Sequence, residues 1–325
     1  MYDLITLGEA MIRFTPPNFQ RLEQVVSLDV SVGGSELNAA VGAARLGMRT
    51  AWISKLTNNP LGRMIVAKAR EHGVDTSHVI WTDEGRVGLY FVEMGASPRA
   101  SQVLYDRRGA AIATMKPEEV DWNAVLGQTR VFHVSGITPA LSADAERTTE
   151  TAIAAARELG CLVTFDLNYR AKLWSPEAAR SCLSRLLPSV NVLITTSDDL
   201  EIVFGLTGER IEVATRIKEM FGLDAVAMTI REAPTVLRGT WTSIALADKL
   251  YEGKVTQLEL IDRVGSGDAY TAGFIYGYLT GDVAKAVAYG DAMSVLKHSI
   301  PGDFIYVTEK EVTEQTKSAR TKIVR

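Results

Sequence analysis

The chain has 325 residues, of which 46% are hydrophobic and 23% are charged, a balance typical of a globular protein with one large core or two domains. Its formal net charge of −4 gives no electrostatic reason to expect nucleic acid or an anionic membrane as a partner. Two cysteines without a C-x-x-C motif, no basic-then-apolar opening segment and no apolar stretch of membrane-spanning length predict a cytoplasmic protein.

From the N-terminus onward, strand-like apolar runs alternate with helix-like runs. This alternation predicts an α/β protein with a mainly parallel central sheet and helices on both of its faces. The strand-like runs lie at residues 2–7, 50–54, 131–134, 161–165, 190–194 and 225–230. The helix-like runs lie at residues 60–71, 142–159, 212–221 and 282–298, with others that begin near Ser35 and Ser175. Residues 235–247 and 255–261 predict antiparallel strands at a sheet edge.

Two stretches interrupt this pattern. Residues 13–32 contain adjacent prolines and mixed charges, which predict an excursion from the core. Residues 86–108 change to the alternation of two antiparallel strands. We therefore expect both stretches to form a small β-sheet lid inserted in one domain of residues 1–310. Residues 311–325 are charged and predict a C-terminal tail that frays.

The run from Asp262 to Phe274 combines a glycine turn, a carboxylate and the start of a helix. Gly265 and Gly267 have no Cβ atom to keep the backbone away from a ligand, and a helical apolar pattern begins at about Gly267. The free N–H groups and the positive dipole end of such a helix favour an anion such as a phosphate. Asp268 would then be placed to take a proton from an attacking hydroxyl. The alternative is that Asp268 is a helix cap beside an ordinary turn.

Two familiar phosphate-binding motifs are missing from the sequence. The pattern G-x-x-x-x-G-K-[ST] does not occur, and Tyr270 replaces the third glycine of G-x-G-x-x-G. Instead, the run resembles the signature D-T-x-G-A-G-D-x-F-x-A-G-F of the ribokinase-like (pfkB) sugar kinases, although Arg263 and Ser266 replace the usual Thr and Ala. The residues that match this signature are Asp262, Gly265, Gly267, Asp268, Ala272, Gly273 and Phe274.

This resemblance implies the ribokinase-like fold and phosphoryl transfer from ATP with Mg²⁺, with a monovalent cation as a further candidate. It implies that Asp268 is the general base and that the amides of Gly265, Ser266 and Gly267 form an anion hole. It also implies a homo-oligomer formed through the lid. The run Gly33-Gly34-Ser35-Glu36-Leu37-Asn38 resembles the family's N-terminal G-G-x-x-x-N signature, which makes Gly34 and Asn38 sugar contacts.

Two polar stretches follow predicted strands, at the sheet edge where open sheets bind ligands. The string from Asp166 to Arg170 resembles the family's D-x-N-x-R, which implies that Asn168 contacts phosphate and that Arg170 contacts sugar or phosphate. Farther along, Thr196 and Asp199 align with a family N-x-x-E pattern linked to magnesium. Thr196 would then contact the nucleotide, and Asp199 would order magnesium-bound water. A solvated acidic face remains an equal alternative.

The substrate class depends on the stretch from Arg99 to Arg107, which is similar to the V-x-Y-D-R segment of the 2-keto-3-deoxygluconate kinase branch. In that branch Tyr and Arg hold the acid end of the substrate, and we accordingly place Tyr90, Tyr105 and Arg107 at the substrate. Without the branch, Arg107 would be a paired cation on an edge strand. Residues 294–304 are also similar to this branch and make Lys297 a nucleotide contact.

The expected activity is ATP-dependent phosphorylation of the terminal 6-hydroxyl of 2-keto-3-deoxygluconate. One alternative is a neutral-sugar or nucleoside kinase of the same fold. Another is a sugar-acid-binding regulatory protein that lost catalysis through two departures from the family pattern. Thr196 replaces the Asn of N-x-x-E, and Arg231 replaces the first Gly of a T-x-G-x-x-G loop that many members have. The intact Asp268 argues against this alternative. The sequence leaves the choice between gluconate and galactonate acids open.

Overall fold

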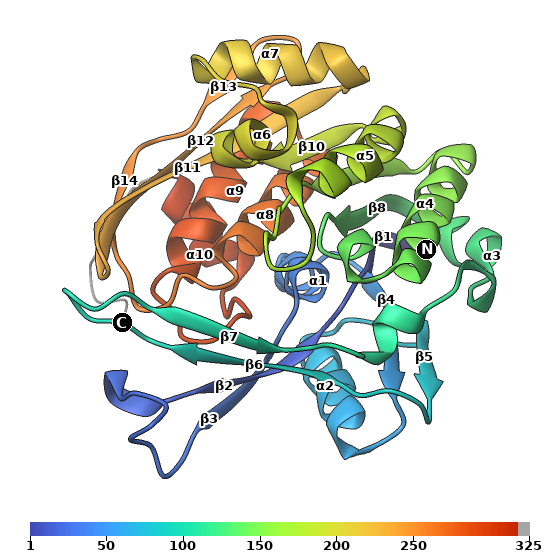
Figure 1. The fold of residues 1–325 in the computed structure, drawn as a ribbon. Coiled ribbons are helices and arrows are strands. Elements are labelled where there is room, and N and C mark those ends of the chain that lie inside the picture. Colours follow the sequence, from blue (N-terminus) through green and yellow to red (C-terminus); the bar gives the residue numbers. More distant parts are fainter. Residues whose placement is uncertain (318–325) are drawn as a thin grey trace.

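The structure, a computed structural model, describes residues 1–317. Its central sheet has the strand order β13-β12-β11-β10-β9-β8-β1-β4-β5, with β14 paired to β12 (Figure 1). Neighbouring strands are parallel from β5 to β11, whereas β12 pairs antiparallel with β11, β13 and β14. The strands are β1 (Tyr2–Leu7), β4 (Thr50–Thr57), β5 (Val79–Thr82), β8 (Thr129–Ser135), β9 (Leu162–Asp166), β10 (Val192–Thr195), β11 (Ala225–Thr235), β12 (Arg238–Leu246), β13 (Leu250–Glu252) and β14 (Thr256–Glu259).

Helices cover both faces of this sheet because consecutive strand residues point to opposite sides. In β1, Ile5 packs in one apolar cluster and Leu4 in another. On the Ile5 face lie α3 (Trp122–Leu126), α4 (Ala143–Glu158), α5 (Pro176–Leu186), α6 (Ser197–Phe204) and α7 (Arg210–Phe221). On the other face lie α1 (Ser35–Arg45), α2 (Pro60–Glu71), α8 (Ser266–Thr280), α9 (Val283–Lys297) and α10 (Glu309–Lys317).

A separate four-stranded sheet crosses one end of the molecule (Figure 1). It consists of β3 (Asp29–Gly33), β2 (Met11–Thr15), β6 (Gly88–Glu93) and β7 (Gln102–Asp106), in that order. We call this sheet the lid. Its strands fall in the two stretches that interrupt the α/β pattern of the sequence, and β6 and β7 are antiparallel as predicted. The ribokinase-like α/β fold with a small second sheet is thus confirmed.

One detail of the sequence prediction is wrong. Residues 311–317, the first part of the predicted tail, do not fray but belong to α10, because Val312 is fully buried in the apolar cluster that α10 shares with α9. The remainder of the predicted tail, residues 318–325, lies outside the described residues. The polar stretch after β10 opens α6 at Ser197, a helix that the sequence analysis did not assign. None of the helices in residues 1–317 is long and apolar enough to cross a membrane.

Candidate active site

A cleft of about 810 Å³ lies between the lid and the ends of the central strands. The structure brings thirteen of the fourteen predicted site residues together in its walls. These residues are Gly34, Asn38, Tyr90, Tyr105, Arg107, Asn168, Arg170, Thr196, Asp199, Gly265, Ser266, Gly267 and Asp268.

The Asp268 carboxylate, in the first turn of α8, is held by two donors from α1. Oδ1 accepts a hydrogen bond of 2.7 Å from the Ser35 hydroxyl, and Oδ2 accepts one of 2.6 Å from the Asn38 amide. The side-chain oxygen of Asn38 in turn accepts from the N–H of Gly34 at 3.2 Å. Asn38, predicted as a sugar contact, therefore also fixes Asp268. Loss of water in the cleft raises the pKa of Asp268, and these two hydrogen bonds oppose that rise.

Residues 262–267, which we call the glycine turn, lead directly into α8. Gly265 has a φ of 82°, and a Cβ atom there would lie 2.2 Å from the carbonyl oxygen of Asp303. Glycine is therefore required at 265 on two grounds. Gly267 has no atom within 4 Å of its Cβ position and borders the cleft. The turn thus leaves an open approach to the backbone at the start of the helix.

Within residues 1–317, the N–H groups of Gly265, Gly267 and Asp268 have no hydrogen-bond acceptor. They lie at the positive end of α8, where an anion is stabilised. The predicted donor Ser266 differs, because its N–H points to the carbonyl of Arg263 at 3.3 Å. Its hydroxyl donates to the same carbonyl at 2.8 Å. The three free donors are therefore those of residues 265, 267 and 268.

Two further carboxylates share the cleft with Asp268. Asp166 ends β9, and its pKa is raised well above the usual range by desolvation and by the nearby charges of Asp268 and Asp199. Desolvation raises the pKa of Asp199 to about 6, and Arg170 opposes this rise. Carboxylates that repel one another in this way would be relieved by a cation.

The donor set of the cleft fits a magnesium ion that keeps most of its water. Among the described residues, no group of three or more His, Cys, Asp and Glu side chains is arranged to hold a metal ion directly. Magnesium usually retains several waters and takes one or two protein carboxylates. Asp199 can supply such a contact. Thr196 caps α6, since its hydroxyl accepts from the N–H of Asp199 at 3.1 Å.

On the lid side of the cleft, Arg107 is engaged by a residue at the end of the first predicted strand. Its guanidinium forms an ion pair with the buried carboxylate of Glu9, which follows β1. The Arg107 guanidinium also lies 5.5 Å from the centre of the Tyr105 ring. The Nε of Arg107 is buried without a partner among the described residues. The Arg107 side chain as a whole is 12% exposed and borders the cleft.

Burial bears on two predicted contacts. The Tyr90 hydroxyl donates to Asp303 Oδ2 at 2.6 Å and the residue is only 3% exposed, so its proton is committed to Asp303 although the residue borders the cleft. Lys297 is fully buried, outside the cleft, and its ammonium donates to the carbonyls of Ile300 at 2.9 Å and Asp262 at 3.4 Å. A side chain without accessible surface cannot contact a nucleotide, so Lys297 instead supports the backbone around the glycine turn.

Residues 1–303 match the family described as pfkB family carbohydrate kinase. The chain belongs to this family.

Several relatives of this pfkB kinase carry sugar-acid names. It is 39% identical over 311 residues to a 2-dehydro-3-deoxygalactonokinase of Haloferax volcanii, covering 95% of each chain. It is 30% identical over 305 residues to a 5-dehydro-2-deoxygluconokinase of Shouchella clausii, covering 92% of this chain and 91% of the relative. The crystal structure of a 2-dehydro-3-deoxygluconokinase from Thermotoga maritima superposes with a TM-score of 0.95 at 35% identity, over 98% of this chain and 99% of that one.

Sequence reasoning missed Ser35 as a site residue of the kinase. It placed Ser35 only at the start of a helix, where α1 does begin, but the Ser35 hydroxyl bonds Asp268. The same hydroxyl accepts a hydrogen bond of 3.1 Å from the Asn168 amide. Asn168 has a φ of 42°, a left-handed conformation that asparagine tolerates better than most residues. Glu9 follows the first predicted strand, and its place at a strand end, where open sheets often bind ligands, is the sequence signal that points to it.

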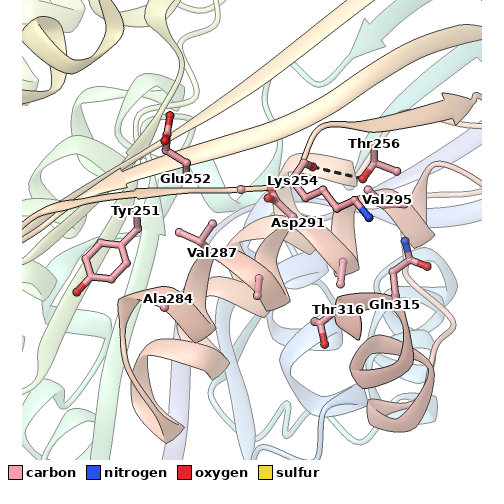
Figure 2. A pocket seen from close by; sticks show the side chains of 13 residues that line it. Tyr251, Glu252, Lys254, Thr256, Ala284, Val287, Asp291, Val295, Gln315 and Thr316 are labelled. Carbon is pink, nitrogen blue, oxygen red and sulfur yellow. Dashed lines mark hydrogen bonds between the residues drawn. The ribbon is translucent and has the colours of Figure 1, made fainter. Parts of the chain in front are cut away.

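A second cavity, of about 270 Å³, lies between β13, β14, α9 and α10 (Figure 2). Its buried carboxylate is Asp291, whose Oδ1 accepts from the Trp241 indole at 2.9 Å. The other oxygen, Oδ2, is covered by Gly253, where a Cβ atom would lie 1.9 Å from it. Burial raises the pKa of Asp291 to about 6. The glycine turn and Asp268 border the larger cleft instead, and we therefore place the active site there.

Proposed function

We propose that this kinase transfers the γ-phosphoryl group of ATP to the terminal 6-hydroxyl of a 2-keto-3-deoxy sugar acid, with 2-keto-3-deoxygluconate as the substrate. The observation that carries the proposal is the Asp268 carboxylate, which Ser35 and Asn38 hold beside three free backbone N–H groups. The names of the Thermotoga maritima and Haloferax volcanii proteins support the sugar-acid class.

In the reaction, the substrate hydroxyl oxygen forms a bond to the γ-phosphorus while the bond from that phosphorus to the β,γ-bridging oxygen breaks. Asp268 accepts the hydroxyl proton, and its raised pKa brings it closer to that of an effective base at neutral pH. Ser35 and Asn38 keep both carboxylate oxygens oriented. The free N–H groups of Gly265, Gly267 and Asp268 stabilise charge on the transferred group.

Asp199 is the residue that would hold a magnesium ion through water, with Asp166 as a second negative charge nearby. Bound with ATP, magnesium neutralises charge on the donor phosphates. The open Cβ position of Gly267 leaves room for those phosphates to approach the backbone. Asn168 and Thr196 also border the cleft and are proposed as nucleotide contacts.

The acid end of the substrate is assigned to Arg107. Its side chain borders the cleft and is 12% exposed, so the guanidinium can meet a carboxylate there while the ion pair with Glu9 keeps it in place. Charge-assisted bonds of this kind are about twice as strong as neutral ones. Tyr105 would pack against the substrate, because its ring is more than one-third exposed and lies beside the guanidinium.

A second candidate, a neutral-sugar kinase, is favoured by the same ion pair. Arg107 already has a carboxylate partner in Glu9 and does not need one from the substrate. Measuring ADP release separates the two. The panel should contain 2-keto-3-deoxygluconate, 2-keto-3-deoxygalactonate, 5-dehydro-2-deoxygluconate, fructose, ribose and adenosine, with mass spectrometry of the products.

We expect kcat/KM to be highest for 2-keto-3-deoxygluconate and at least tenfold lower for fructose, ribose and adenosine. Preference for a neutral acceptor would contradict the sugar-acid assignment. No ADP release with any acceptor, together with measurable binding of a sugar acid, would favour the regulatory alternative. The matched control is Asp268→Asn, which should remove ADP release without removing binding.

A further inference from the structure

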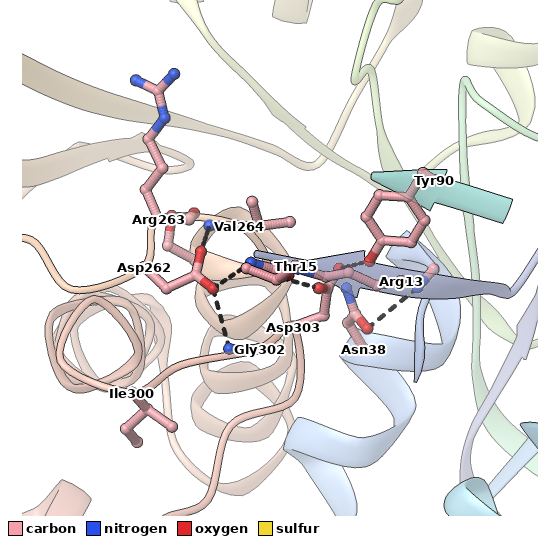
Figure 3. Close-up of polar contacts among 12 residues, drawn as sticks. Arg13, Thr15, Asn38, Tyr90, Asp262, Arg263, Val264, Ile300, Gly302 and Asp303 are labelled. Atoms are coloured by element: carbon pink, nitrogen blue, oxygen red, sulfur yellow. Dashed lines mark hydrogen bonds and ion pairs between the residues drawn. The ribbon is translucent and has the colours of Figure 1, made fainter. Parts of the chain in front are cut away.

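Arg13 is a fully buried arginine of the lid whose side chain extends to two carboxylates beside the glycine turn (Figure 3). It lies on β2, and its guanidinium forms two ion pairs outside the lid. Nη1 lies 2.8 Å from Asp303 Oδ1, and Nη2 lies 2.6 Å from Asp262 Oδ2. Its third nitrogen, Nε, donates to the hydroxyl of Thr15 on the same strand at 2.9 Å.

The two carboxylates that Arg13 binds set the shape of the glycine turn. Asp262 is its first residue, and its Oδ1 accepts from the N–H of Val264 at 3.0 Å. Its Oδ2 accepts from the N–H of Gly302 at 3.0 Å as well as from Arg13. The carbonyl oxygen of Asp303 lies against Gly265, 2.2 Å from the position that a Cβ atom would take. Any displacement of the guanidinium would therefore move the backbone that presents the free N–H groups of α8.

The buried carboxylates beside the glycine turn are neutralised by protein cations, with little access to solvent. Asp262 and Asp303 are 3% and 5% exposed, and they face the cations of Arg13 and Lys297. Burial alone would lower the pKa of Arg13, but the two carboxylates outweigh it and raise that pKa. A buried ion-pair network gives little net stability compared with apolar side chains of the same volume. Its distinctive contribution is a fixed geometry.

The lid has a second link to the same point. Tyr90, on β6 and in register with Arg13, donates to the other oxygen of Asp303 at 2.6 Å. The Tyr90 ring stacks on Tyr105, with ring centres 5.9 Å apart, and Tyr105 borders the proposed acid site with Arg107. The lid surface that would contact the sugar acid is thus joined by side chains to the turn that would contact the donor phosphates.

We propose that Arg13 is a positioning residue that couples sugar-acid binding at the lid to the geometry of the glycine turn. It touches neither ligand, and the inference rests on the function proposed above. Closure of the lid on the sugar acid is transmitted through Arg13 to Asp262 and Asp303. Each ligand therefore strengthens the binding of the other, and the backbone N–H groups that would bind the transferred phosphoryl group are aligned only when both ligands are bound.

The test compares three purified variants with the wild type. Arg13→Lys keeps the charge but cannot bind two carboxylates with a planar fork. Thr15→Val is the matched control, since it removes the Nε hydrogen bond and leaves both ion pairs outside the lid. Arg99→Gln removes a different lid ion pair, with Glu93 at 2.9 Å. Circular dichroism and Tm establish that each variant is folded.

Calorimetry then gives the Kd of a non-hydrolysable ATP analogue with and without saturating sugar acid. In the wild type we expect the acid to tighten nucleotide binding by a factor within the usual allosteric range of about 5 to 150. In Arg13→Lys this factor should fall towards one and kcat should fall about 100-fold, while the Kd of the acid alone changes less than threefold. Thr15→Val and Arg99→Gln should keep the wild-type coupling factor and the wild-type kcat. Unchanged coupling and kcat in folded Arg13→Lys would overturn the proposal.

If Arg13→Lys does not fold, hydrogen exchange of the wild type decides the matter. Sugar acid alone should slow exchange in residues 262–267, and the nucleotide analogue alone should slow exchange in β2. No change in either segment would overturn the role of Arg13. A wild type that phosphorylates none of the acids would contradict the proposed function instead, and the nucleotide arm of the exchange measurement would still test Arg13.

Discussion

The Ser35 hydroxyl donates its only proton to Asp268, in a hydrogen bond of 2.7 Å. Because Asn38 donates to the other carboxylate oxygen, both oxygens of Asp268 act as acceptors. These two hydrogen bonds favour the ionised form of the carboxyl group, which can receive a proton, and they oppose the rise in pKa that burial causes. Its base function would therefore depend on α1 as much as on α8.

Replacing the carboxylate itself should abolish most of the turnover. Asp268→Asn cannot accept the hydroxyl proton, and we expect kcat to fall by about 10²- to 10⁴-fold, the usual worth of a positioned general base. The Kd of the sugar acid, measured by calorimetry, should change only a few-fold. Turnover near that of the wild type in the folded variant would show that another group is the base.

Removing the Ser35 hydroxyl should shift the pH dependence of the enzyme. The hydrogen bond from Ser35 lowers the pKa of Asp268, so Ser35→Ala should raise that pKa. The ionised base is populated above its pKa, and the acid limb of the profile of kcat/KM against pH should therefore move to higher pH. At neutral pH the loss of one bond to a charged group, about 1.5–3 kcal/mol, should lower kcat/KM. An unmoved acid limb would contradict this role.

The two glycines of the turn should respond oppositely to alanine. Gly265→Ala puts a Cβ against the Asp303 carbonyl in a left-handed conformation, and it should destabilise the protein. Gly267→Ala meets no protein atom in the first turn of a helix, so its stability should be equal or up to about 1 kcal/mol greater. It should nevertheless raise the KM for ATP, because the methyl group enters the cleft. Thermal unfolding and steady-state kinetics of the pair check both statements.

Loss of the Arg107 side chain should weaken binding of the sugar acid. Arg107→Ala should cost roughly 2–5 kcal/mol of sugar-acid binding, because the bond is charge-assisted and the substrate carboxylate is left unpaired. Arg107→Lys should recover only part of this. The effect should appear in KM for the acid and leave KM for ATP nearly unchanged, provided that chemistry is slower than substrate release. A variant equally active on acid and neutral sugars would refute the assignment.

A buried glutamate outside the catalytic step should make stability depend on pH. Glu36 on α1 is fully buried, and burial raises its pKa to about 7 although Ser135 and Thr138 donate hydrogen bonds to it. Because the folded state binds this proton more tightly than the unfolded state, the contribution of Glu36 falls as pH rises from about 4.5 to 7.

Glu36→Gln removes that titration. Its Tm relative to the wild type should therefore increase between pH 5 and pH 8, by at most the equivalent of about 3 kcal/mol. Thermal unfolding of both proteins across this range is the measurement, and a constant difference in Tm would contradict the assigned pKa.

How far the sequence could predict the structure differs between the scaffold and the site. The central strands were predictable because buried parallel strands are continuous apolar runs, as in residues 161–165. Asp268 was found because its glycine turn and helix start are local. Arg13 could not be found this way, since its partners lie 249 and 290 residues farther along the chain. In a lid strand an arginine reads as a surface residue.

The prediction that Lys297 contacts the nucleotide was wrong for a related reason. A lysine in a matching family segment suggests a ligand contact, but only the fold shows that its ammonium is enclosed by the carbonyls of Asp262 and Ile300. The oligomer predicted through the lid and the monovalent cation stay predictions. Sequence patterns report neighbours along the chain well and pairings between distant buried charges poorly.

The two ion pairs of Arg13 also have a consequence for biosynthesis. The arginine is made early, whereas both of its counter-charges are encoded in the last quarter of the sequence. Chains are synthesised from the N-terminus, so a nascent chain exposes an unpaired lid arginine until Asp262 and Asp303 have emerged. A fragment cut between Asp268 and Asp303 would keep Asp268 but lose a counter-ion of Arg13, and such a fragment should be inert and a ready substrate for cellular proteases.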